Sequence, residues 1–136
     1  MEPYEDTRQK IETLVKSFHD TDYPSMEVNY QDRMITDVEN VFGEFVTVEL
    51  DMKLKHLDMQ VNRCVRVNGQ LVLNHFNVKG KGSKVFTTYS DAFQNFMGLK
   101  TLLEITFYEV NPFSNKNLDG FDGRMNIVEF EIEYFT

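Results

Sequence analysis

The sequence has one cysteine, Cys64, and therefore cannot form a disulfide within the chain. A lone thiol fits a reducing compartment, where disulfides are rare. Long apolar stretches are also missing, and no run approaches the roughly 18 residues that a membrane-spanning helix requires. The acidic opening, residues 1–6, lacks the basic and then apolar character of a signal peptide. These absences favour a protein of the cytosol or of a virion over a secreted or membrane protein.

Positive charge is scarce in this chain, with 14 lysine and arginine residues against 22 acidic residues and a net charge of −8. Sequence-independent binding of nucleic acid requires clustered basic residues, so the composition disfavours that function. The basic residues concentrate between Lys53 and Lys84, where Asp58 is the single acid and the local net charge is +6, which leaves −14 for the remainder. These seven residues, a candidate protein interface, are Lys53, Lys55, Arg63, Arg66, Lys79, Lys81 and Lys84.

This uneven charge distribution has two interpretations. A basic surface and acidic surfaces on one small domain suit head-to-tail association of identical copies, in which unlike patches meet around a ring or along a fibre. Alternatively, the charges cluster along the sequence and simply face solvent. The sequence leaves both interpretations open.

Hydrophobic periodicity predicts two helices and four clear strands. Residues 5–19 and 84–97 place apolar residues at three- and four-residue steps, and Pro24 ends the first helix because it steers the preceding residue away from helical geometry. Alternating apolar and polar residues predict the strands, with a weaker one near 26–30 and with Gly69 marking a bulge or bend. The four clear strands are 45–56, 64–78, 101–110 and 125–135, and residues 111–123 are predicted as loop.

The order of these elements predicts an α+β fold. We expect one domain over residues 1–136, with a mostly antiparallel sheet of about four to five strands, an N-terminal helix and a second helix near 84–97. A length of 136 residues with 41% hydrophobic residues is enough for one such core.

Two glycine-containing segments resemble ligand loops but lack the required spacing. At Gly80–Lys84, the glycine that a nucleotide-binding loop needs five residues before Gly80 is replaced by His75. Residues 115–126 match the first half of a calcium loop, but the last ligand position holds Asn126 in place of glutamate. We therefore expect a basic strand-to-helix turn, at which an anion could still bind helix amides, and a polar loop.

The remaining polar residues form no catalytic or metal-binding pattern. The histidines, His19, His56 and His75, lack ligand spacing and are predicted at helix ends, strand ends or the sheet surface. Cys64 lies in a predicted strand and is interpreted as a packing residue. The sequence therefore predicts no catalytic residue, no cofactor and no metal site.

The last predicted strand has an acidic face formed by Glu129, Glu131 and Glu133. A glycosidase pair would face each other across a cleft with different pKa values, an arrangement that three neighbouring acids on one strand do not suggest. We expect a solvated or lumen-facing acidic surface that also discourages unwanted strand pairing.

Several short motifs together resemble those of one protein family. They are Asn29-Tyr30 after Tyr23-Pro24, Arg66-Val-Asn-Gly69 in the long strand, Gly80-x-Gly82 opening a helix, Ser90-Asp91 within that helix, and Asn126 to Tyr134 as a closing amphipathic strand. With the order of elements, these motifs make the chain similar over nearly its whole length to the tail-terminator family of long-tailed bacteriophages, which includes lambda-type minor tail protein U. Residues 31–43 have no counterpart in that pattern.

The resemblance implies a structural protein of the virion tail, assembled in the host cytoplasm, and not an enzyme. Such proteins form rings, commonly of six copies, that cap the finished tail tube, stop its polymerisation and join the tail to the head. The implied partners are further copies of the chain, the tail-tube protein and a head-completion protein, with DNA passing without specific binding and no membrane. An acidic lumen formed by Glu129, Glu131 and Glu133 would keep that DNA from adhering.

The charge balance leaves an alternative from another class, a small acidic binding module such as a phage-encoded inhibitor that mimics the charge of DNA. Its acids should form one broad surface, which the +6 segment interrupts in sequence. An assembly protein should instead associate with copies of itself. The arrangement of acidic and basic residues in space bears on this choice.

Overall fold

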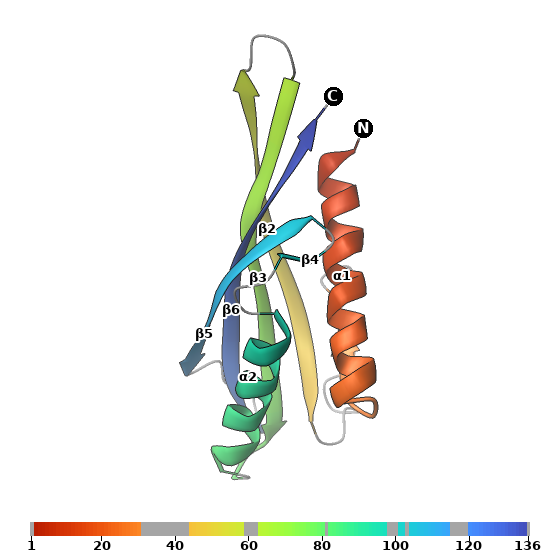
Figure 1. Cartoon of the computed structure of the whole chain (residues 1–136). Helices are drawn as coiled ribbons and strands as arrows, with labels where there is room; N and C mark the ends of the chain where they lie inside the picture. Colours follow the sequence, from red (N-terminus) through yellow and green to blue (C-terminus); the bar gives the residue numbers. More distant parts are fainter. Residues whose placement is uncertain are drawn as a thin grey trace.

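A computed structural model of the chain has the predicted α+β architecture (Figure 1). It describes residues 2–30, 44–58, 63–80, 82–97, 101–102, 104–114 and 120–135, with the backbone alone at 56–58, 63, 102 and 113–114. Two helices, α1 (Pro3–Asp22) and α2 (Lys84–Met97), pack on one face of a six-stranded sheet. The strands are β1 (Glu27–Asn29), β2 (Phe45–Asp58), β3 (Arg63–Val78), β4 (Thr101–Leu102), β5 (Ile105–Ser114) and β6 (Phe121–Phe135).

The strand order in the sheet is β1-β2-β3-β6-β5-β4. β1 pairs with β2 in parallel, and every other neighbouring pair is antiparallel. The mostly antiparallel sheet predicted from the sequence is therefore confirmed, although the outermost strands β1 and β4 are only three and two residues long. The two longest strands, β3 and β6, lie at the centre.

Helix α1 follows from its end residues as well as from its apolar stripe. Pro3 suits the first helical turn, where its missing N–H is not needed, and the carboxylates of Glu5 and Asp6 favour the positive end of the helix dipole. At the other end, the N–H of Tyr23 donates to the carbonyl of His19 over 2.8 Å. The helix is longer than the predicted 5–19. The prediction was too short because the residues at both ends of the helix continue no apolar periodicity.

The core lies between the two helices and the sheet. Phe18 of α1 is fully buried, and its ring centroid lies 5.6 Å from those of Tyr89 and Phe93 on α2. Such aromatic contacts stabilise packing beyond the area that they bury. The helical residues buried in this core are Ile11, Leu14, Val15, Phe18, Tyr89, Phe93 and Met97.

Gly69 does not mark a bulge, so that part of the prediction is wrong. It lies opposite Met52 on β2 and Phe130 on β6, and the register continues without a shift on both sides. The glycine is required for another reason, because a Cβ at this position would lie 1.8 Å from the carbonyl oxygen of Asp51. The backbones of β2 and β3 approach too closely here for a side chain.

The register shift of the sheet lies in β5, between Phe107 and Val110. β5 then continues to Ser114 and β6 begins at Phe121, so the loop predicted over residues 111–123 is wrong at both ends. Polar residues and Pro112 lower strand propensity in this stretch, but pairing with β6 overrides that local preference.

Candidate interaction surface

The face of the sheet opposite the helices has most of the charged side chains that the sequence singled out. Directly opposed residues of antiparallel strands point to the same face, so the register arranges these side chains in rows across β2, β3 and β6. Three successive rows are Lys55–Arg66–Glu133, Lys53–Asn68–Glu131 and Asp51–Gln70–Glu129. We call these nine residues the charged face.

Arg66 and Glu133 form an ion pair on the charged face. Nη2 and Nε of Arg66 donate to Oε1 of Glu133 over 2.7 and 3.2 Å. This hydrogen bonding raises the pKa of the Arg66 guanidinium. The interpretation of a basic surface separate from the acidic strand therefore does not hold for Arg66, because β3 and β6 pair residue by residue.

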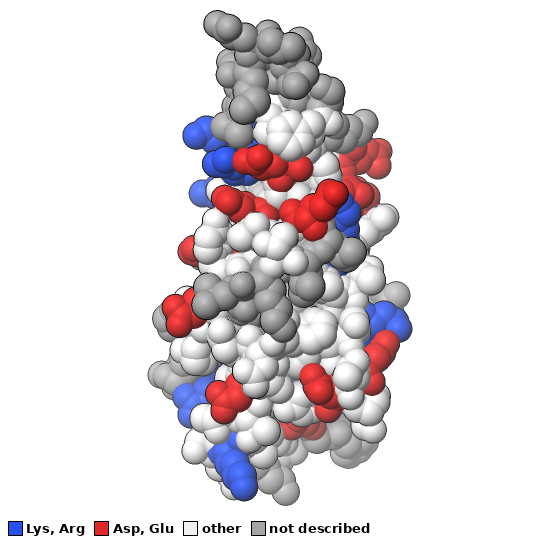
Figure 2. Space-filling view, in the orientation of Figure 1, with Lys and Arg blue, Asp and Glu red and all other residues white. Residues whose placement is uncertain are grey.

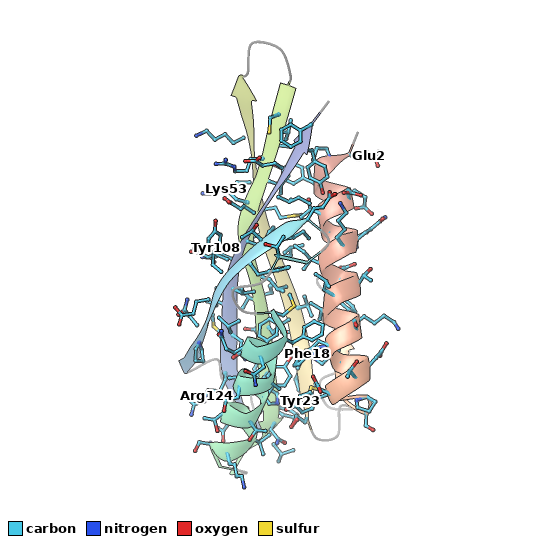
Figure 3. All side chains as sticks on the ribbon, in the orientation of Figure 1. Glu2, Phe18, Tyr23, Lys53, Tyr108 and Arg124 are labelled. Atoms are coloured by element: carbon cyan, nitrogen blue, oxygen red, sulfur yellow. The ribbon has the colours of Figure 1, made fainter. Side chains whose placement is uncertain are left out.

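A groove of about 720 Å³ runs along the charged face. Figure 3 shows Lys53 and Tyr108 on the side of the sheet away from α1, whereas Phe18 lies between α1 and the sheet. The polar side chains that line the groove from the three central strands are Asp51, Lys53, Asn68, Gln70, Glu129 and Glu131. Two of the three predicted acidic residues thus share one groove with one predicted basic residue.

Tyr108 of β5 also lines the groove, and sequence analysis did not select it as a site residue. The register shift after Phe107 places Tyr108 beside β6, where a hydrogen bond to Glu131 raises the pKa of its phenol. The side chain is still 42% exposed. The register shift that positions Tyr108 has no signal in the sequence.

The other candidate basic residues lie elsewhere. Lys79 directly follows β3, and at the usual rise of a strand it lies on the order of 40 Å along β3 from Arg66. Lys84 begins α2. Arg124 of β6 joins them, with its guanidinium carbon 5.8 Å from the ring centroid of Phe86. We call Lys79, Lys84 and Arg124 the basic end. In Figure 2, basic atoms lie at the lower left of the molecule, and acidic and basic atoms are interleaved in its upper half.

The seven candidate basic residues therefore do not form one patch. Lys53, Lys55 and Arg66 belong to the charged face, and Lys79 and Lys84 belong to the basic end. The backbone of Arg63 pairs with Asp58, but its side chain and all of Lys81 lie outside the described residues.

The basic turn between β3 and α2 is confirmed as a strand-to-helix connection. Gly80 and Gly82 have φ angles of 91° and 84°, which favour glycine over other residues. The N–H of Gly80 donates to Oδ2 of Asp122 over 3.2 Å. A carboxylate of the chain itself thus occupies one backbone amide of this turn.

The prediction that places all three histidines at element ends or the sheet surface is wrong for His75. His75 lies opposite Val46, in a row that faces the helices, and is fully buried. Burial lowers its pKa to about 3, so the ring is neutral at physiological pH. His19 is at a helix end as predicted, but it too is buried, and desolvation lowers its pKa.

Metal coordination finds no support in the part of the chain that the structure describes. No group of three histidine, cysteine or acidic residues there could hold a metal ion. Cys64 is buried, as expected of a packing residue, and the side chain of His56 is not described. In the calcium-like segment, residues 115–119 lie outside the described residues, and Oδ1 of the buried Asn126 accepts a hydrogen bond from Ser90 over 2.6 Å.

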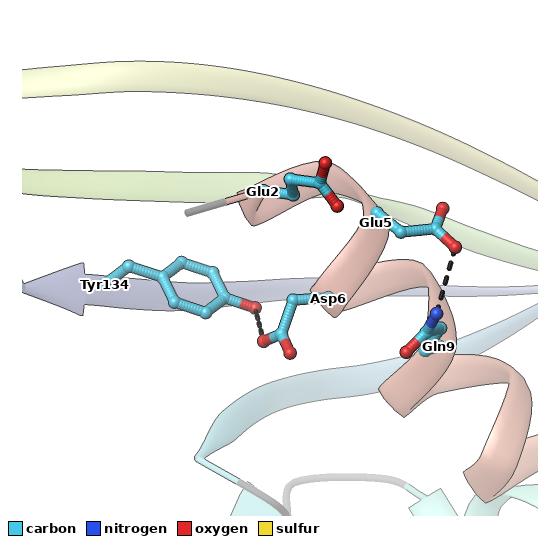
Figure 4. Close-up of a pocket in the computed structure, with 5 residues that line it drawn as sticks. All are labelled: Glu2, Glu5, Asp6, Gln9 and Tyr134. Carbon is cyan, nitrogen blue, oxygen red and sulfur yellow. Dashed lines mark hydrogen bonds between the residues drawn. The ribbon is translucent and has the colours of Figure 1, made fainter.

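A second pocket, of about 650 Å³, lies at the start of α1 (Figure 4). The hydroxyl of Tyr134 donates to Oδ2 of Asp6 over 2.7 Å and lies 2.8 Å from Oγ1 of Thr7. Burial raises the pKa of Tyr134 to about 12, and the hydrogen bond from Tyr134 lowers the pKa of Asp6. These bonds join the first turn of α1 to the end of β6, which is a structural role.

No protein-family model matches the sequence, and no curated protein matches it. Among solved structures, the chain is similar to a protein whose name states no function, with a TM-score of 0.65 and 12% sequence identity over 96% of this chain and 95% of the other. At that identity the similarity concerns the fold, and it supports the α+β arrangement. Within the described residues, no helix combines the length and the apolar character needed to cross a membrane.

Proposed function

We propose that this chain is a structural assembly protein of a bacteriophage tail, a terminator that caps the tail tube, stops its polymerisation and joins it to the head. The proposal rests on the resemblance of its motifs to the tail-terminator family and on its α+β fold. A function of this kind depends on surfaces that meet other proteins rather than on catalytic groups.

The observation that carries the proposal is the charged face. Both helices pack on the opposite side of the sheet, so the groove on this face is open to a partner. A ring requires two different surfaces on one molecule that fit each other in successive copies. The charged face and the basic end are two different surfaces on separate parts of the fold, as such a ring would need.

Most of the segments that resemble the family form one unit in space, whereas Tyr23-Pro24 and Asn29-Tyr30 lie apart, at the end of α1 and at the edge strand β1. The Arg66–Gly69 motif lies in β3, the Gly80-x-Gly82 turn connects β3 to α2, and β6 pairs along β3. These elements are the centre of the sheet and a helix that covers it. The resemblance therefore concerns mainly a contiguous part of the structure, which supports a shared architecture.

The alternative, an acidic module that mimics DNA, receives less support from the same surface. Two of the acids of β6, Glu131 and Glu133, stand in rows with basic residues of β2 and β3, and Glu133 is ion-paired with Arg66. A DNA mimic needs a broad surface of one sign, and the charged face has both.

Assembly of the tail-tube protein encoded with this chain tests the proposal. We expect tubes polymerised in the presence of the chain to be shorter and to have additional density at one end in electron micrographs. Tubes that reach the same length with and without the chain, and do not bind it in co-sedimentation, would refute the terminator function. Heat-unfolded chain is the control for non-specific effects on polymerisation.

A further inference from the structure

We infer that copies of this chain associate by placing the basic end of one copy in the groove of the charged face of the next. The inference rests on the proposed function, because it names the two surfaces through which the ring would close. The partner that fits the groove is thus a second copy of the same chain.

The groove has unneutralised negative charge. Asp51, Glu129 and Glu131 contribute three carboxylates and Lys53 contributes one ammonium, so its net charge is −2. Within the described residues, none of these three carboxylates forms a salt bridge. The Tyr108 phenol that bonds Glu131 is neutral and leaves that charge in place. A partner with basic side chains would therefore be attracted to this groove.

The basic end has the opposite net charge. Lys79, Lys84 and Arg124 contribute three positive charges, and the neighbouring Asp122 contributes one negative charge, for a net charge of +2. Lys79 and Lys84 are exposed, and they lie where β3 stops and α2 starts, at one end of the molecule (Figure 1). The two surfaces are thus complementary in sign and equal in magnitude.

Their separation on one molecule makes the contact intermolecular. Asn68 and Gln70 in the groove and Lys79 at the basic end are on the order of 30 Å apart along β3. A long, regularly paired strand cannot fold back over that distance, so the basic end reaches only the groove of another copy. A contact between two different surfaces is heterologous, and its repetition closes into a ring or extends as a fibre.

The groove also has groups that would orient a basic side chain. The exposed ring of Tyr108 gives a face to which an ammonium or guanidinium group is attracted, and the amides of Asn68 and Gln70 add hydrogen-bond acceptors. An occupied groove would withdraw Glu129 and Glu131 from a lumen. Glu133 would then be the one predicted lumen acid outside the contact, and its charge is paired with that of Arg66.

Two charge-reversed variants and their mixture test this inference by sedimentation velocity at low ionic strength. E129K/E131K makes the groove basic, and K79E/K84E makes the basic end acidic, so each variant alone should associate on the order of 100-fold more weakly than the wild type. In an equimolar mixture, every contact between unlike variants pairs opposite charges. We therefore expect the mixture to associate as the wild type does.

The matched control is D22K/E27K, which reverses two exposed carboxylates outside the groove and should associate normally. Circular dichroism melts establish that all variants are folded. The inference is overturned if the wild type stays monomeric to its solubility limit, if either variant alone associates normally, or if the mixture does not recover. If E129K/E131K loses association and K79E/K84E keeps it, the contact would instead be two-fold, with the charged faces of two copies meeting each other.

The tube assay separates this inference from the proposed function. Variants that cap tubes as well as the wild type does would overturn the docking contact and leave the terminator function standing. If association is lost in each variant and recovered in the mixture, but the chain does not bind tubes, the docking contact would stand and the terminator function would be refuted.

Discussion

At Gly69 the position of a side chain is taken by the backbone of the neighbouring strand. An alanine Cβ there would lie 1.8 Å from the carbonyl oxygen of Asp51, far inside van der Waals contact. Backbone cannot move aside as a flexible side chain can, so β2 and β3 would have to separate. Strand propensity alone would favour alanine over glycine, and the close approach reverses that preference.

We therefore expect Gly69→Ala to lower the free energy of unfolding by on the order of 3 kcal/mol, at the upper end of overpacking effects. Urea denaturation measures the change. Asn68→Ala, at the exposed neighbouring position, should change it by less than about 0.5 kcal/mol. Equal stabilities of the glycine and alanine proteins would contradict the close approach.

His75 is a second residue whose environment decides its chemistry. It is neutral in the folded state until about pH 3, whereas in the unfolded chain it gains a proton near pH 6.5. The unfolded state thus binds more protons over this range, so the free energy of unfolding falls as the pH decreases, by about 1.4 kcal/mol per pH unit for one histidine. The lowered pKa of His19 acts in the same direction.

His75→Leu tests this contribution. We expect its free energy of unfolding to fall less steeply than that of the wild type from about pH 6.5 to about pH 5, by about 1.4 kcal/mol per pH unit in the lower part of that range. Glu44, whose Oε1 lies 3.3 Å from Nε2 of His75, opposes the trend in both proteins because burial raises its pKa. Equal slopes would show that His75 is not buried as a neutral ring.

Among the elements, α1 and α2 are joined by a buried hydrogen bond. Nδ1 of His19 lies 2.8 Å from the carbonyl oxygen of Val15, which can only accept, so this nitrogen has the proton. Nε2 of the neutral ring therefore accepts the hydroxyl proton of Tyr89, over 2.8 Å. Burial lowers the pKa of His19, which agrees with a neutral ring.

We expect Tyr89→Phe to lower the free energy of unfolding by about 1–3 kcal/mol, because the buried Nε2 of His19 loses its partner. A double-mutant cycle with His19→Leu should give a coupling energy of about 1 kcal/mol or more in urea denaturation. Tyr4→Phe, at an exposed tyrosine of α1, is the control and should be nearly neutral. Additive effects of the two core substitutions would contradict the bond.

The elements also differ in how well the sequence predicts them. α2 was predicted at its observed bounds because glycines flank a clear apolar stripe, and β2 was predicted to within two residues by strict alternation. The sequence did not predict that β5 and β6 extend into residues 111–123, because pairing between the two strands overrides the polar composition of this stretch. The same pairing buries His75, which local sequence cannot indicate.

For the whole molecule, the charged residues of the candidate surface were recognisable from composition, but their grouping was not. Arg66 and Glu133 are 67 positions apart, and β3–β6 pairing alone brings them together. It also divides the basic segment between the charged face and the basic end. Sequence thus predicted which residues bear charge, and the topology determines which of them are neighbours.

If unlike charges hold copies together, association should depend steeply on salt. The screening length falls from about 10 Å at 0.1 M to about 3 Å at 1 M ionic strength, so we expect sedimentation to show dissociation over this range. The thermal melting temperature of the monomer should change little by comparison, because its core is apolar. Association that strengthens with salt would instead indicate an apolar interface.

The position of β6 at the centre of the sheet has a consequence for when this chain can assemble. Its residues pair with β3 partners 43 to 71 positions earlier, from Val78–Phe121 to Cys64–Phe135, so long loops must close before the sheet is complete. Both surfaces need β6, since Glu129 and Glu131 belong to the groove and Arg124 to the basic end. A nascent chain without β6 would lack two carboxylates of the groove and the arginine of the basic end, so both surfaces would be incomplete until folding is finished.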